Sequence, residues 1–81
     1  MTLHILTPEK TLYHGEVDSV TLPGASGLFT VLQNHAPMIS ELRKNEAITY
    51  MQGEQRETLT LGGGFVEVWK NSVTVCAENQ P

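Results

Sequence analysis

The 81-residue chain has a single cysteine, Cys76, so it cannot form an internal disulfide. Residues that commonly bind metals are few: the three histidines are scattered, and no Cys-x-x-Cys or His-x-x-x-His pair occurs. Domains this small often depend on disulfides, metals or partners for stability. We therefore expect no metal site and no cofactor, and we expect partner proteins to stabilise the chain.

Basic residues are scarce, with five Lys and Arg against nine Asp and Glu, for a net charge of −4. No basic run is longer than two residues. Binding to a phosphate backbone needs several clustered cations. Nucleic acid is therefore not an expected partner.

Long apolar segments are also missing, since no run approaches the roughly 20 residues that cross a bilayer as a helix. The opening segment MTLHILTPEK lacks the basic and apolar regions of a signal peptide. Together with the lone cysteine, this predicts a reducing, cytoplasmic compartment. The length predicts one domain over residues 1–81.

Turn signals recur at short intervals between runs rich in β-branched and apolar residues, which is typical of a small all-β domain. The predicted strands are Leu3–Leu6, Glu16–Leu22, Leu28–Leu32, Ala47–Met51, Glu57–Leu61, Phe65–Trp69 and Ser72–Cys76. We expect an all-β fold, a small flattened antiparallel β-sandwich or barrel of about 8–10 short strands.

Three local features refine this prediction. The alternation in Glu16–Leu22 slips between Val17 and Val20, as a bulge would cause. Lys70-Asn71 predicts a tight turn, because asparagine tolerates the left-handed conformation. Met38–Lys44 is the best helix candidate, and it is short.

Two glycine-rich segments are candidate phosphate loops, and both fail the test. Neither Gly62-Gly63-Gly64 nor the segment PGASG at Pro23–Gly27 has the lysine, hydroxyl residue and following helix of a P-loop. The triple glycine predicts a tight chain reversal or close backbone packing. For Pro23–Gly27, a contact surface and a plain turn both remain open.

No pattern points to catalysis. Serines, histidines and an aspartate are present, but no Gly-x-Ser-x-Gly nucleophile elbow occurs. Cys76 ends an apolar strand and is interpreted as a small buried hydrophobic residue. Trp69 faces away from Val66 and Val68 by strand alternation, so it either covers the edge of the core or lies in an interface.

His35 lies in the segment LQNHAPMI, between two apolar runs. Pro37 favours an extended Ala36 and disfavours a helix before it, so His35 lies at a shaped corner. The favoured interpretation from the residues alone is a structural hydrogen bond. An interface contact is the main alternative, ahead of catalysis.

The segment Val20–Pro37, VTLPGASGLFTVLQNHAP, closely resembles the V-T-L-P-G-x-x-G-x-F-G-V-L-P-G-H-A-P segment of the F-type ATP synthase epsilon-subunit family. Gly15–Val17, Leu61–Val68 and Asn71–Val75 agree in order, so the resemblance covers nearly the whole chain. The sequence departs from the family pattern at four places: Thr30 replaces glycine, Gln33-Asn34 and Lys44-Asn45 each replace Pro-Gly, and Leu28 replaces a frequently acidic residue.

The resemblance implies a non-catalytic central-stalk rotor subunit that links the gamma subunit to the membrane c-subunit ring, so that proton-driven rotation is coupled to ATP synthesis. It implies a peripheral position on the cytoplasmic face of the bacterial inner membrane. The family usually adds a C-terminal helical hairpin after the sandwich. Because this sequence ends with the sandwich, we expect neither inhibition by inserted helices nor ATP binding.

The resemblance also assigns site residues. The loop Gly24, Ala25, Ser26, Gly27 and Leu28 is expected to meet the c-ring. Thr7, His35 and Ser40 are expected to face gamma, with Met38 and Ile39 adding apolar area. Two alternatives come from other classes. A small β-barrel ligand-binding or interaction module would need a roomy apolar cavity, and a small enzyme would need converging titratable groups.

Overall fold

The computed structural model describes residues 1–78, and within them the chain forms nine strands and no helix. The strands are β1 (Thr2–Leu6), β2 (Thr11–Glu16), β3 (Ser19–Gly24), β4 (Gly27–Leu32), β5 (Met38–Leu42), β6 (Glu46–Gln52), β7 (Gln55–Leu61), β8 (Gly64–Trp69) and β9 (Ser72–Ala77). The all-β prediction is therefore confirmed.

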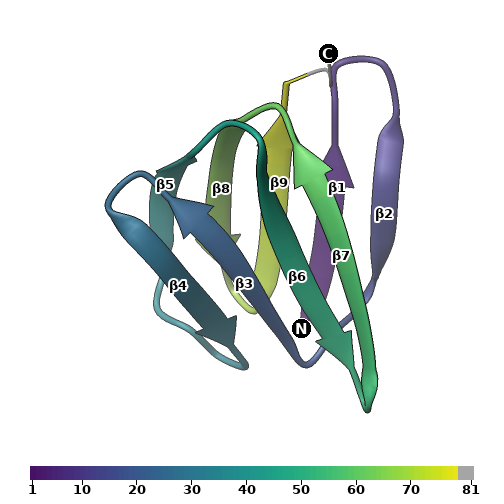
Figure 1. Ribbon diagram of the computed structural model, residues 1–81. Coiled ribbons are helices and arrows are strands. Elements are labelled where there is room, and N and C mark those ends of the chain that lie inside the picture. The colour runs from purple at the N-terminus through teal and green to yellow at the C-terminus, as the bar shows by residue number, and fades with distance from the viewer. Residues whose placement is uncertain (79–81) are drawn as a thin grey trace.

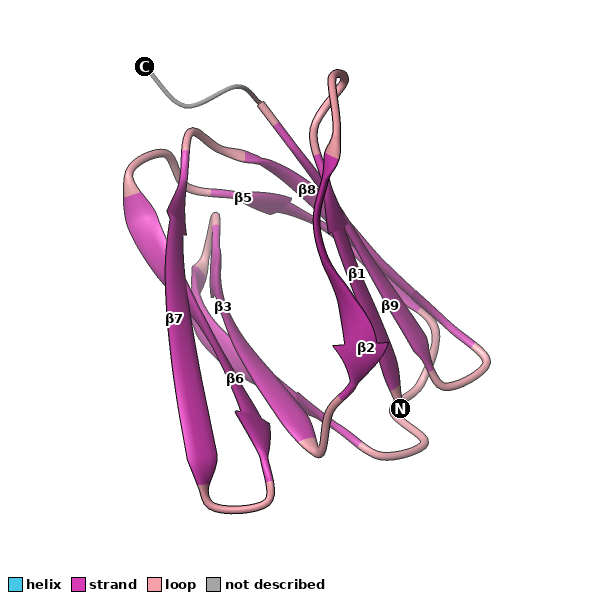
Figure 2. Ribbon diagram, turned by 90° about the vertical axis from the view of Figure 1, so that its right-hand side faces the viewer, coloured by secondary structure: helices cyan, strands magenta, loops and turns pink. Residues whose placement is uncertain are grey.

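The strands form one sheet in the order β2-β1-β9-β8-β5-β3-β6-β7, with β4 paired to β3. The sheet curls so that β3, β4, β6 and β7 lie in front of β5, β8, β9 and β1 (Figure 1). Seen from the side, these two layers enclose the interior (Figure 2). The fold is thus a half-barrel or sandwich made from a single continuous sheet.

One strand pair departs from the predicted antiparallel arrangement. β1 and β9 run parallel, with Leu3 opposite Val73 and Ile5 opposite Val75, so the sheet is mixed. The two strands come from opposite ends of the chain and need no short connection, so the constraint that favours antiparallel neighbours does not apply to them.

The core follows from strand alternation in both layers. Leu3, Ile5, Val66, Val73 and Val75 are fully buried from the back layer. Their cross-strand register places them on one face. The front layer contributes a matching set: Val20, Leu22, Val31, Ile48 and Tyr50.

Two predictions about strands are wrong. Met38–Lys44 is not helical, because Met38–Leu42 pairs with β8 along its whole length. Glu16–Leu22 is not one bulged strand: β2 ends at Glu16 and β3 begins at Ser19. The Val17 and Asp18 amides bond to Met1 and Met51, which holds a corner between the two layers.

Asparagines adopt the left-handed conformation at three turns, one of which is the predicted Lys70-Asn71 turn. Asn34 and Asn45 both have φ of 59°, and Asn71 has φ of 61°. Short amide side chains tolerate this conformation better than most others. The substitutions Gln33-Asn34 and Lys44-Asn45 therefore preserve the turns.

Candidate subunit interfaces

The β3–β4 turn, predicted as the c-ring loop, is braced from below by the β5–β6 loop. The Ala25 amide donates to the Glu41 carbonyl at 2.9 Å, and the Arg43 amide donates to the Pro23 carbonyl at 2.8 Å. The Arg43 guanidinium also donates to the Ala25 carbonyl at 3.3 Å. Ala25 and Ser26 are exposed above this support, and Leu28 is 71% exposed. A turn that is held by hydrogen bonds and exposes one large apolar side chain, Leu28, can make a specific contact.

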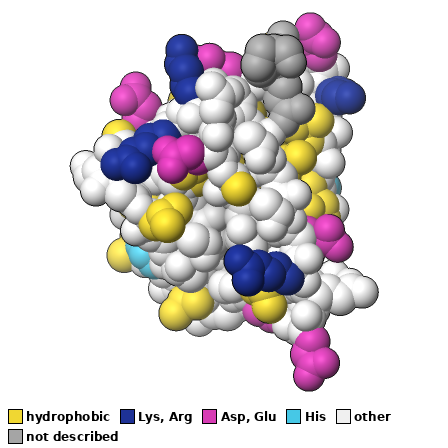
Figure 3. Space-filling model, in the orientation of Figure 1, with side chains coloured by type: hydrophobic (Ala, Val, Ile, Leu, Met, Phe, Trp, Pro, Cys, Tyr) yellow, Lys and Arg dark blue, Asp and Glu magenta, His cyan; other side chains and the backbone are white. Residues whose placement is uncertain are grey.

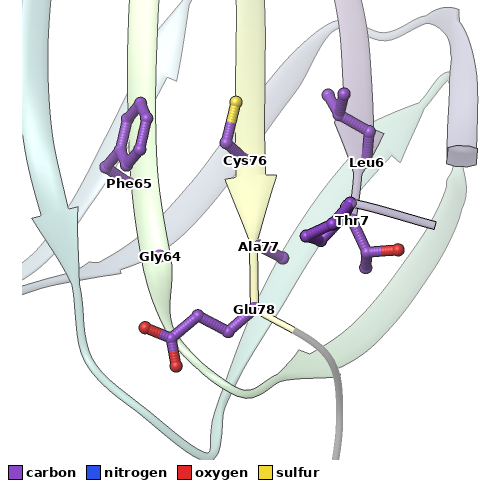
Figure 4. A pocket seen from close by; sticks show the side chains of 8 residues that line it. Leu6, Thr7, Gly64, Phe65, Cys76, Ala77 and Glu78 are labelled. Carbon is purple, nitrogen blue, oxygen red and sulfur yellow. The ribbon is translucent and has the colours of Figure 1, made fainter. Parts of the chain in front are cut away.

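Thr7 lies at the edge of an apolar surface groove of about 360 Å³. The Thr7 hydroxyl forms hydrogen bonds within its own loop: it accepts from the Glu9 and Lys10 backbone amides and donates to the Lys10 carbonyl. Figure 4 shows Leu6, Cys76 and Phe65 in a row across β1, β9 and β8. The groove is lined by Leu6, Thr7, Pro8, Gly64, Phe65, Cys76, Ala77 and Glu78.

Cys76 is half-buried on the outer face, so its predicted place in the core is wrong. Val73, Val75 and Ala77 point inward on β9. Alternation then directs Cys76 outward, beside Phe65.

His35 is half-buried in the β4–β5 loop, and its Nδ1 lies 2.7 Å from the Ala36 carbonyl oxygen. This is the structural hydrogen bond that the sequence favoured. The loop is also tied to the β8–β9 turn, because the Asn71 amide oxygen accepts from the Asn34 amide at 2.8 Å. The Asn71 side-chain nitrogen donates to Gln33. The corner is therefore fixed before any partner binds.

Met38 and Ser40 lie on the inner side of β5 and are half-buried. Met38 packs against the core cluster. The Ser40 hydroxyl donates to the Glu41 carbonyl at 3.1 Å. Between them, Ile39 points outward and is 71% exposed.

The residues expected to face gamma, Thr7, His35 and Ser40, are not gathered at one point. β5 and β1 run in the same direction. β5 pairs antiparallel with β8, β8 pairs antiparallel with β9, and β9 pairs parallel with β1. Thr7 follows the end of β1 and His35 precedes the start of β5, so the two lie at opposite ends of the back layer. The β3–β4 turn lies at the same end of the molecule as Thr7, because Gly24 pairs with Leu42 at the end of β5.

The structure adds an apolar surface that runs between these ends, the β5–β8 outer face, made by Ile39, Phe65 and Trp69. Phe65 is 49% exposed and Trp69 is 55% exposed. Ile39, Pro37 and Trp69 also line a second shallow hollow on this face. Lys70 places its ammonium 5.5 Å from the Trp69 ring. Sequence reasoning identified Trp69 and Ile39 but missed Phe65, although the alternation that directs Trp69 outward applies equally to Phe65.

The opposite face, formed by β3, β4, β6 and β7, is more mixed. Figure 3 shows its hydrophobic side chains as separate spots, with basic side chains dispersed among acidic and neutral ones. Threonines on neighbouring strands pair there, Thr21 with Thr30 at 2.9 Å and Thr49 with Thr58 at 3.5 Å. Two large apolar side chains on β4 of this face, Leu28 and Leu32, are also exposed, whereas Ile39, Phe65 and Trp69 are exposed on the back layer.

Among the described residues, Glu16 and Tyr50 have shifted pKa values, and neither shift points to catalysis. Hydrogen bonds from the Met1 amino group and from Thr2 lower the pKa of Glu16 below its ordinary value. Burial raises the pKa of Tyr50. Among residues 1–78 no group of three or more His, Cys, Asp or Glu side chains is arranged to hold a metal ion. The same residues include no helix that could cross a membrane.

Comparison with known proteins identifies the domain. The sequence profile of the ATP synthase delta/epsilon chain beta-sandwich domain matches residues 1–80. An ATP synthase epsilon chain of Leptospira interrogans is 38% identical over 79 residues, which cover 98% of this chain and 61% of the relative. An epsilon chain of Chlorobaculum tepidum is 38% identical over 77 residues, covering 95% of this chain and 88% of the relative.

Solved structures show the same fold at low sequence identity. A chain in the Euglena gracilis mitochondrial ATP synthase structure of OSCP/F1/c-ring has a TM-score of 0.86 at 18% identity, covering 93% of this chain and 48% of that one. A chain in the Tetrahymena thermophila mitochondrial ATP synthase central stalk and c-ring structure has a TM-score of 0.81 at 12% identity, with coverages of 96% and 63%.

Proposed function

This chain belongs to the ATP synthase epsilon-chain family, as its beta-sandwich domain, and we propose that it joins the gamma subunit to the c-ring in the central stalk of a bacterial F-type ATP synthase. As a member of this family it is a non-catalytic subunit of an enzyme that makes ATP. Its task is mechanical: the proton-driven ring and gamma turn together through it, at the cytoplasmic face of the inner membrane. The chain spans about three-fifths of the Leptospira relative it matches, 61%.

The observation that supports this task is the β5–β8 outer face. Three large apolar side chains, Ile39, Phe65 and Trp69, are each about half exposed or more. These side chains share the face with the exposed carboxylates of Glu41 and Glu67. Large exposed apolar side chains gathered on one face of a small domain often mark a site for another protein. The adjoining groove extends this surface to Thr7, and Pro37 extends it towards His35. Thr7 and the corner that holds His35 therefore border this surface, whereas Ser40 lies on the inner side of β5.

The β3–β4 turn is the proposed contact to the c-ring. It lies at the end of the sandwich where Thr7 also lies, and its backbone is held by Arg43 and Glu41. A braced loop transmits torque better than a mobile one, because close-packed and hydrogen-bonded parts deform little. Leu28, 71% exposed, supplies apolar contact area where the family often has an acidic side chain.

The alternative of a β-barrel that encloses a ligand gains no support. The interior is occupied by sixteen buried hydrophobic side chains contributed by both layers. The groove beside Phe65 and the hollow beside Trp69 lie on the outer face of β8, away from this core. An interaction surface fits these positions better than a ligand cavity.

Size-exclusion chromatography of the chain mixed with the gamma subunit of the same organism tests the proposal. We expect co-elution as a one-to-one complex, weakened at least tenfold in the double variant Phe65→Asp/Trp69→Asp. The triple change of Thr7, His35 and Ser40 to large charged residues should also weaken it. Gln55→Asp, on the exposed start of β7, is the matched control and should bind normally. Unchanged binding by all correctly folded variants would show that gamma does not use this face.

A further inference from the structure

We propose that His4 and His14 form a two-histidine site for a divalent transition-metal ion such as Zn²⁺, on the outer face of β1 and β2. The two residues lie directly opposite each other in the β1–β2 register. Their ring centroids are 4.8 Å apart, and the ring planes are inclined by 34°. This proposal is independent of the gamma and c-ring assignments.

The backbone pattern shows why the rings lie so close. The Val17 amide donates to the Met1 carbonyl, which makes Thr2–Glu16 a non-hydrogen-bonded pair of the antiparallel ladder. Two residues further along β1, His4–His14 is a pair of the same class. Such pairs have the shorter Cα separation, about 4.5 Å, and their side chains project side by side. This close pairing on one face allows the two imidazoles to share one metal ion.

The surroundings of the pair suit a cation. His14 is exposed and His4 is half-buried, so an ion can reach both rings. The His4 Nε2 has only a long contact to the Thr11 hydroxyl, 3.3 Å, which a metal ion would easily replace. The Glu16 carboxylate lies on the same face of β2, two residues from His14. It adds negative potential while it remains bonded to Thr2 and to the Met1 amino group.

The ligand types define the class of ion. Neutral imidazole binds Zn²⁺, Ni²⁺ and Cu²⁺, whereas Mg²⁺ and Ca²⁺ prefer oxygen ligands. Because no third protein ligand is arranged at the pair within residues 1–78, water completes the coordination. β2 is the end strand of the sheet order, so a bound ion would link this edge to β1. Binding to the folded state alone stabilises it.

Isothermal titration calorimetry with ZnCl₂ at pH 7.5 tests the site on the full chain. We expect one equivalent to bind, and we expect His4→Gln and His14→Gln each to lose at least 90% of the affinity. His35→Gln is the matched control, because it removes the third histidine at a remote corner. Cys76→Ser excludes the thiolate as the ligand. Both controls should bind Zn²⁺ as the unaltered chain does.

Thermal unfolding provides the second readout. Zn²⁺ should raise the melting temperature of the unaltered chain, of His35→Gln and of Cys76→Ser, but not of folded His4→Gln or His14→Gln. Circular dichroism confirms that each variant is folded. The proposal is overturned if Zn²⁺ fails to bind at millimolar concentration, if either histidine variant retains normal affinity, or if Cys76→Ser or His35→Gln abolishes binding.

Discussion

Gly64 is a residue whose identity the backbone dictates. Its φ of +137° is unfavourable for any side chain, and an added Cβ would collide with the Cys76 carbonyl oxygen and lie 2.9 Å from the Ala77 Cα. We expect Gly64→Ala to lower the free energy of unfolding by roughly 2–5 kcal/mol, the sum of backbone strain and overpacking. Urea denaturation measures the change. Gly53→Asn is the control, because Gly53 has φ of +60° in open space and asparagine tolerates that conformation. Similar midpoints for the two variants would contradict the steric argument.

Protonation of Glu16 makes the stability of the folded state depend on pH in the acidic range. Its pKa is lowered in the folded protein by bonds from the Met1 amino group and Thr2, so between the folded and unfolded pKa values the unfolded chain binds more protons. Stability therefore rises with pH in this window and is lost as pH falls from about 4.5 through the folded value. Glu16→Gln should be less stable than the unaltered chain at pH 7 and nearly equal at pH 2. Melting temperatures of untagged protein across this range test the effect, with Glu54→Gln as the control. A difference that does not shrink in acid would exclude the linkage.

At the scale of the element, β8 separates two roles within one strand. Val66 is fully buried between β5 and β9, whereas its neighbour Phe65 is 49% exposed. Val66→Ala should cost about 2–3 kcal/mol of stability and leave gamma binding intact in the folded fraction. Phe65→Ser should cost less than about 1 kcal/mol and weaken gamma binding. Denaturant titration and the gamma co-elution assay, applied to both variants, check this division. A large stability loss for Phe65→Ser would assign Phe65 to the core instead.

The elements that sequence reasoning found are those with clear alternation. Phe65–Trp69 and Ser72–Cys76 have strict periodicity around an asparagine turn, and both became strands. β5 was mistaken for a helix because Met38–Leu42 is short and its apolar residues, Met38, Ile39 and Leu42, follow no strict alternation. Only pairing with β8 fixes its conformation. β2 was missed because His14-Gly15 resembles a turn, yet Gly15 pairs with Leu3 inside the strand.

At the scale of the whole molecule, what could not be predicted is how distant segments meet. The family resemblance supplied the residues Thr7, His35 and Ser40, but their separation along the back layer depends on the β1–β9 and β5–β8 pairings. The β1–β9 and β8–β9 pairings place Leu6, Cys76 and Phe65 in one groove. The 4.8 Å approach of His4 to His14 depends on the β1–β2 register. None of these contacts is visible in local spacing.

The curled sheet brings its end strand β2 against β6, which lies next to the other end strand, β7, at a tyrosine pair. Tyr13 on β2 and Tyr50 on β6 have ring centroids 4.4 Å apart, and burial raises the pKa of Tyr50 above its ordinary value of 10.0. The folded state therefore keeps the phenol proton at a pH where the unfolded chain has lost it. This contribution is fully present below pH 10 and is lost as pH rises through the folded pKa.

We therefore expect the melting temperature of the unaltered chain to fall between pH 8 and pH 11, and Tyr50→Phe to fall less over the same range. Tyr13→Phe keeps the ring pair and the Tyr50 phenol, so it should retain most of the alkaline loss. If Tyr50→Phe and the unaltered chain fall in parallel, the alkaline sensitivity arises elsewhere. If Tyr50→Phe alone is protected, the burial of the Tyr50 phenol accounts for the alkaline loss.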